Sequence, residues 1–206
     1  MKHLLTVFFL LFSFTLSLRA ETYVTEEGVQ IDRCACAWFI LRFVDEEAQF
    51  KFFKNGEKPP AGIGFDYYGA PYFHKGPDCS FTSFIKKHPN QKTTNQKALQ
   101  EINQLVNDVF AWRDGPKSNA SLLRLAIDEF NQNHTDQEIF TSSVAIFDYV
   151  YLKFGGILPS TPLKQAIERL KTEQQIDYLD GKFQAQKDPS QTNKSALLTF
   201  LKALQN

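Results

Sequence analysis

The segment at residues 26–45, EEGVQIDRCACAWFILRFVD, opens with polar turn residues, and its helical part at 29–44 is then apolar on every side except for Asp32, Arg33 and Arg42. With a turn of about 100° per residue, no face of this helix is polar, so the helix is expected to be buried. A buried charge without a partner costs roughly several kcal/mol. The sequence therefore predicts that each of the three charged side chains is paired, caps a helix or faces a solvated cleft.

Two explanations account for these charges. In the structural one, Asp32 caps its own helix at the positive end of the helix dipole, and the two arginines form ion pairs. In the functional one, Arg33 points into a pocket near the helix start, where backbone N–H groups also favour an anion. The segment alone leaves both explanations open.

Residues 1–20 indicate where the protein is found. Lys2 and His3 precede an uncharged apolar run at residues 4–18, and the small Ala20 follows. This is the pattern of a secretory signal peptide, and the run is short for a membrane span of about 20 residues. We expect cleavage after Ala20 and a periplasmic or secreted protein that is not an integral membrane protein, with an uncleaved anchor as the alternative.

The remaining residues are numerous enough for one compact domain. The 23 basic and 23 acidic residues balance, so the chain shows no basic footprint for nucleic acid. Three cysteines in an oxidising compartment leave at least one thiol unpaired or bound to metal. Cys34 and Cys36 project about 200° apart on a helix, so any disulfide should join Cys79 to one of them.

Hydrophobic periodicity predicts a helix-rich α/β fold, with a small sheet of short strands in the N-terminal half and packed helices in the C-terminal half. The expected strands are 23–25, 48–54, 64–68 and 71–74. Ser80 is the expected N-cap of a helix at 81–87, and the other expected helices are 29–44, 96–112, 119–131, 137–153, 163–172 and 194–204. Residues 21–156 are assigned to the domain and residues 157–206 to a helical extension packed on it.

A second motif, YFHKGPDCSF at residues 72–81, places His74, Asp78 and Cys79 within six residues. All three side chains can bind a metal or transfer a proton. Their spacing matches no strong zinc pattern, and the structural alternatives are a turn histidine, a turn aspartate and a buried thiol. The sequence leaves the cofactor open, with a divalent metal ion on these three residues as the candidate.

Taken together, the motifs resemble the chromate resistance protein family, specifically the C-terminal domain of ChrB and its exported single-domain relatives. The resemblance rests on EGVQIDRCACAWFILRFVDEEAQFKF, GFDYYG and FHKGPDCSF, continues more weakly through IFDYVYLKFG, and does not reach residues 157–206. The family pattern falls on Asp32, Arg33, Trp38, Arg42, Phe43, Asp66, His74, Gly76, Cys79, Phe81 and Asp148. The chain departs from the family pattern at Gln30, where the family commonly has a histidine. The departure matters if that histidine is a metal ligand or a general base, because an amide neither titrates nor binds metals well.

The resemblance implies a role in chromate resistance or sensing and supplies no mechanism. Chromate is a tetrahedral dianion, which Arg33, a cationic His74 and N–H groups at the helix start are suited to hold. One function is therefore a binding protein for an oxyanion or a metal, with the candidate residues Asp32, Arg33, Arg42, His74, Asp78, Cys79 and Asp148.

The alternatives are an enzyme of unknown reaction, in which Asp32 or Asp148 is the base and His74 its partner, and a non-catalytic interaction module. We also predict that Arg33, His74 and Asp78 lie around one cleft. A buried Arg33 needs an acidic partner, and Asp66 and Asp78 are the nearest candidates in the strand-rich half.

Overall fold

The computed structural model describes residues 20–89, 95–115, 118–131, 134–158 and 202–204. Its elements are β1 (Thr22–Glu26), α1 (Ile31–Phe39), the π-helix η1 (Ile40–Val44), β2 (Gln49–Phe53), β3 (Ile63–Gly64), α2 (Ser80–Lys87), α3 (Gln96–Phe110), α4 (Asn119–Asn131) and α5 (Asp136–Lys153). The helix expected at 163–172 lies outside the described residues, as do all but residue 20 of the leader at 1–20 and all but residues 202–204 of the helix expected at 194–204. The division into a domain and an extension stays a prediction.

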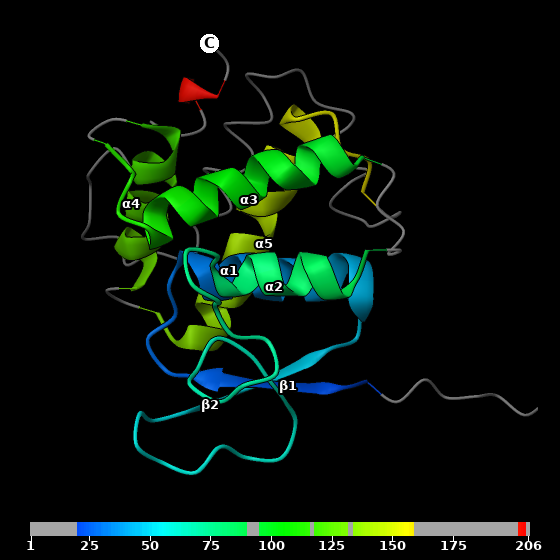
Figure 1. Ribbon diagram of the computed structural model, residues 1–206, viewed down its shortest axis with the longest axis vertical. Helices are drawn as coiled ribbons and strands as arrows, with labels where there is room; N and C mark the ends of the chain where they lie inside the picture. The colour runs from blue at the N-terminus through cyan, green and yellow to red at the C-terminus, as the bar shows by residue number, and fades with distance from the viewer. Residues whose placement is uncertain (1–19, 90–94, 116–117, 132–133, 159–201, 205–206) are drawn as a thin grey trace, which may run out of the picture.

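The sheet has three parallel strands in the order β2-β1-β3. Parallel neighbours need a crossover connection, and α1 with η1 supplies it between β1 and β2. In Figure 1 the strands lie at one end of the molecule, α1 and α2 lie side by side next to them, and α3 crosses on the far side of these two helices. The start of α1 is thereby placed where the sheet and the helices meet.

Helix α1 is the centre of the core and packs against α2, α3, α4 and α5. All six residues from Cys34 to Phe39 are 0% exposed. Aromatic rings of Phe43, Phe81, Phe147 and Tyr151 surround Trp38. The predicted burial of this segment is confirmed, and apolar contacts on all sides explain why the helix has no polar face.

The predicted fold class is confirmed, since the described residues form five α-helices and a small sheet of short strands in the N-terminal half. The strands expected at 64–68 and 71–74 are wrong. Beyond β3, Phe65 and Tyr72 share only an isolated bridge, because Asp66 and Gly69 have φ angles of 52° and 87° and turn the chain out of the extended conformation.

A smaller correction concerns the first helix. The helix begins at Ile31 rather than at residue 29, because Gln30 is extended, with φ −120° and ψ 175°, and Gly28 has a positive φ of 79°. All three cysteines are buried and free. Within the described ranges, no helix combines the length and apolar character needed to cross a bilayer.

Candidate functional site

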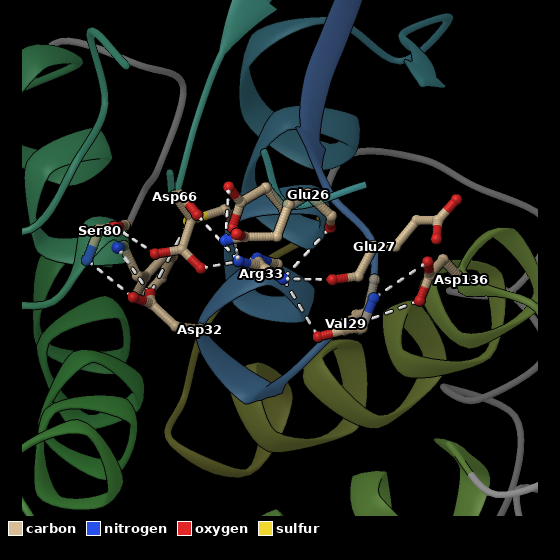
Figure 2. Close-up of polar contacts among 12 residues, drawn as sticks. Glu26, Glu27, Val29, Asp32, Arg33, Asp66, Ser80 and Asp136 are labelled. Carbon is tan, nitrogen blue, oxygen red and sulfur yellow. Dashed lines mark hydrogen bonds and ion pairs between the residues drawn. The ribbon is translucent and has the colours of Figure 1, made fainter. Parts of the chain in front are cut away.

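Arg33 lies at the junction of β1, α1 and the loop after β3 (Figure 2). Its Nη1 donates to the carbonyl oxygens of Glu26, Glu27 and Gly28 at 3.2, 3.0 and 3.1 Å. Its Nη2 donates to the Asp66 carbonyl oxygen at 3.1 Å, and its Nε lies 2.9 Å from Asp66 Oδ2 in an ion pair without hydrogen-bond alignment. The guanidinium is therefore surrounded by acceptors of the protein, and the side chain is only 14% exposed.

Asp32 caps α2 rather than its own helix. Its two carboxylate oxygens accept the backbone N–H groups of Ser80 and Phe81, both at 2.8 Å. The expectation that Ser80 caps α2 is wrong, because Cys79 is the N-cap residue and makes no capping side-chain bond. The Ser80 hydroxyl instead donates to Asp66 Oδ1 at 2.6 Å. Ser80 thus links the buried carboxylate of Asp32 to the partly buried carboxylate of Asp66, as Figure 2 shows.

The carboxyl groups of Asp32 and Asp66 both have a raised pKa. Burial and the nearby charge of Asp66 raise the pKa of Asp32 to about 7, against the effect of the two backbone donors. Burial also raises the pKa of Asp66, and the neighbouring Arg33 opposes that rise. Because the two groups interact, the pair changes its charge near neutral pH.

A second charged centre joins η1 and α5. Asp148 is 0% exposed and accepts hydrogen bonds from Arg42 Nε and Nη2 at 2.9 and 2.8 Å and from Trp38 Nε1 at 2.9 Å. The guanidinium fork therefore meets the carboxylate in a bidentate pair. Both oxygens of Asp148 are occupied by the protein, so this centre holds helices together.

A cavity of about 410 Å³ opens at the start of α1. It is lined by Gln30, Ile31, Asp32, Val109, Phe110, Trp112, Arg124 and Asp128. Gln30, the N-cap residue of α1, makes no capping side-chain bond, and the first N–H groups of a helix have no partner within it. The cavity therefore borders a helix start that its own N-cap side chain leaves uncapped.

Arg124 supplies the positive charge of the cavity. Its Nε donates to Asp114 at 2.9 Å and its Nη1 donates to Asp128 at 3.2 Å. Its Nη2 makes no hydrogen bond to the part of the chain that the structure describes. Two carboxylates thus orient the guanidinium at the wall of the cavity.

Asp78 and Cys79 lie in different surroundings although they are adjacent. Asp78 pairs with Lys86 on the surface, where the lysine is 66% exposed. Cys79 is fully buried with its thiol 3.4 Å from the Thr82 hydroxyl, and burial raises its pKa to about 12. A thiol in this state is protonated at neutral pH and is a poor metal ligand.

His74 packs its ring against Phe73 and Phe110, and its Nδ1 is buried without a hydrogen-bond partner. In the described ranges no three His, Cys, Asp or Glu side chains are grouped to hold a metal ion, the proposed set of His74, Asp78 and Cys79 included. Of the two partners expected for Arg33, Asp66 pairs with it and Asp78 does not. None of Arg33, His74 and Asp78 lines the cavity.

Comparison with known proteins identifies the family. The protein-family model described as ChrB, C-terminal domain, matches residues 23–154. The chain belongs to this family. Protein ChrB of Cupriavidus metallidurans (strain ATCC 43123 / DSM 2839 / NBRC 102507 / CH34) is 38% identical over 90 residues, which are 43% of this chain and 27% of that protein. The match thus spans about a quarter of that relative's length, and no solved structure matches the chain.

The family resemblance predicted from the motifs is confirmed, and the structure shows what those motif residues do. Asp32, Arg33 and Asp66 form the closed cluster at the start of α1, and Arg42 and Asp148 join η1 to α5. The motif residues of this ChrB C-terminal domain mostly hold elements together.

Sequence reasoning missed the residues on the opposite wall of the cavity. Arg124 and Asp128 are four apart on one helix, the spacing of neighbours on a helix face, and this was the available signal. Trp112 stands where α3 ends, and no periodicity marks it as exposed. That these residues meet Gln30 and Asp32 depends on how α3 and α4 pack against α1, which local patterns do not contain.

Proposed function

We propose that this chain is an exported member of the ChrB C-terminal family that acts in chromate resistance by binding a small oxyanion, such as chromate, in the cavity at the start of α1. Family membership supports the role in chromate resistance, and the pattern of residues 1–20 supports export. One observation carries the site: a helix start that its N-cap side chain leaves uncapped and an arginine oriented by two carboxylates line the same cavity.

Both groups suit an anion for physical reasons. N–H groups in the first turn of a helix point outward and carry the positive end of the helix dipole. The Nη2 of Arg124 adds a charged donor, which forms shorter and stronger hydrogen bonds to an oxyanion than a neutral donor does. Asp114 and Asp128 fix the direction of the guanidinium, so little side-chain freedom is lost on binding.

Asp32 sets the pH dependence of this site. It lines the cavity, and its ionised form repels an anion. Because its pKa is raised to about 7, Asp32 loses its charge as the pH falls through this value. Oxyanion binding should therefore be tighter at pH 6 than at pH 8.

The sequence suggested Arg33 as an anion-binding residue, and in this proposal its role is structural. Its contacts to three carbonyl oxygens and to Asp66 fix the loop that leads into α1. It thereby positions Gln30 and the first turn of the helix without contacting the ligand.

A metal cation is the second candidate ligand, because Asp32 and Asp128 both line the cavity beside the amide of Gln30. Carboxylate and amide oxygens suit a hard divalent cation. The sign of the pH dependence separates the two ligands. A cation binds more tightly as Asp32 ionises, which is the opposite of an oxyanion.

Isothermal titration calorimetry of the purified protein at pH 6 and pH 8 tests the proposal, with chromate, sulfate and magnesium as probes. Sulfate is the reference because it stays a dianion throughout this range. We expect one equivalent of oxyanion to bind, more tightly at pH 6, and Arg124→Gln to weaken binding by about tenfold or more through loss of a charged hydrogen bond.

Arg113→Gln is the matched control, because Arg113 forms an exposed pair with Asp108 and does not line the cavity. Its oxyanion affinity should equal that of the unchanged protein. Tighter magnesium binding at pH 8 with no oxyanion binding would favour the cation instead. If neither probe binds, the proposal is refuted. Export is tested by N-terminal sequencing of the protein isolated from the periplasm or medium, which should begin at Glu21.

A further inference from the structure

The cavity is large for a mineral oxyanion. Its volume of about 410 Å³ falls within the range of roughly 300–1,000 Å³ that is typical of pockets for organic ligands. A tetrahedral ion such as sulfate occupies only a fraction of this space. The rest of the cavity is therefore available to a larger molecule.

The walls of the cavity are half apolar. Four of its eight lining residues are apolar, namely Ile31, Val109, Phe110 and Trp112. Water against these side chains is released when an apolar group replaces it, which favours binding. A ligand with both a polar and an apolar part matches this lining better than an ion alone.

Trp112 is the most unusual of these residues. Its side chain is 90% exposed although it is a large aromatic group, and its backbone φ of 56° lies in the left-handed region, which is costly for a residue other than glycine. Its N–H donates to the Val109 carbonyl oxygen at 3.1 Å, so the turn that ends α3 fixes it beside the cavity. An exposed ring held in this way is suited to stack on a planar ligand.

From these observations we infer that the ligand of the cavity is an organic oxyanion, with its anionic group at the start of α1 and Arg124 and its planar apolar body against Phe110 and Trp112. This inference rests on the proposed function, because it uses the same anion position. It adds the chemical class of the ligand: a carboxylate, phosphate or sulfonate carried on a ring.

A series of sulfonates tests the inference, since the anionic group stays the same while the apolar body grows. The probes are sulfate, methanesulfonate and naphthalene-2-sulfonate, titrated by calorimetry at pH 6. We expect naphthalene-2-sulfonate to bind at least about tenfold more tightly than methanesulfonate, because it buries the exposed aromatic surface.

Trp112→Ala should remove most of that gain, measured as the ratio of the naphthalene-2-sulfonate affinity to the methanesulfonate affinity. Tyr68→Ala is the matched control, since Tyr68 is 92% exposed and does not line the cavity. In this control the gain should persist. Thermal melting of both variants checks that the fold is intact, as expected for side chains that are almost fully exposed.

The outcomes separate the inference from the proposed function. If sulfate binds and the naphthalene ring adds no affinity, or if the gain survives Trp112→Ala, the inference is overturned and the oxyanion proposal stands. If only naphthalene-2-sulfonate binds and Trp112→Ala abolishes it, the organic ligand is supported and a free mineral oxyanion is excluded. If no probe binds, both proposals fail.

Discussion

Two polar regions meet at Asp32 and differ in how their groups are satisfied. On one side, Asp32, Arg33 and Asp66 form the closed cluster, in which the protein itself supplies the partners, Ser80 among them. On the other side is the cavity, where the Gln30 side chain makes no capping bond to the helix start and Arg124 is oriented by Asp114 and Asp128. The difference indicates that the closed cluster holds the helix start in place and that the cavity is where a ligand binds.

The Arg42–Asp148 pair extends this comparison to the other end of the helical segment. It too is enclosed by protein groups, with Trp38 as the third partner. Removing one member of a buried pair leaves the other charge without compensation, which costs much more than losing a surface pair. Changes in the closed regions should therefore affect stability, and changes in the cavity should affect binding.

The largest expected effect is that of Asp148→Ala. The change leaves the Arg42 guanidinium and the Trp38 N–H without their acceptor, so the free energy of unfolding should fall by about 3–5 kcal/mol. Urea denaturation followed by circular dichroism measures the loss. Asp108→Ala, which breaks the more exposed pair with Arg113, is the control and should cost less than about 1 kcal/mol. Similar losses in the two variants would show that the buried Arg42–Asp148 pair contributes no more to the free energy of unfolding than the more exposed pair.

Arg33→Lys should have the next largest effect. A lysine cannot reach the three carbonyl oxygens and Asp66 together, so the free energy of unfolding should fall by about 1–3 kcal/mol. The sulfate affinity of the folded protein should fall less than in Arg124→Gln, because Arg33 positions the helix start and does not line the cavity. A variant of unchanged stability that no longer binds sulfate would instead make Arg33 a ligand-binding residue.

The third expected effect, similar in size to that of Arg33→Lys, is the pH dependence of stability. The pKa of Asp32 is about 7 in the folded protein and near 3.8 when the carboxyl is exposed, so the folded state binds more protons between these values. Stability should therefore decrease as the pH rises from about 4 to about 7. Asp32→Asn should flatten this part of the curve in urea titrations at pH 5 and pH 7. A stability that rises over this range equally in both proteins would contradict the raised pKa.

Local patterns were enough for much of the fold. Apolar spacing placed α2 to α5 within a few residues of their observed ends, and the absence of a polar face predicted that α1 is buried. The same rules failed at residues 64–74, where alternating aromatic residues look like strands but left-handed residues break the extended chain. Turn geometry there outweighs hydrophobic alternation.

The site was harder to predict from the sequence than the fold, because its contacts join distant segments. The need of Arg33 for an acidic partner correctly suggested Asp66. That Asp32 caps a helix beginning 48 residues later could not be seen, because capping rules look only at neighbouring residues. The walls formed by Phe110, Trp112 and Arg124 depend on helix packing, for which no local motif exists.

The central claim, that the ligand lies in the cavity and not in the closed cluster, is tested most directly by anomalous diffraction from crystals soaked in chromate. Chromium should appear beside the first turn of α1, within contact distance of Arg124 and away from the Arg33 guanidinium. A chromium peak on Arg33 or His74, with the cavity empty of it, would contradict the account and return the site to the residues that the sequence motif first suggested.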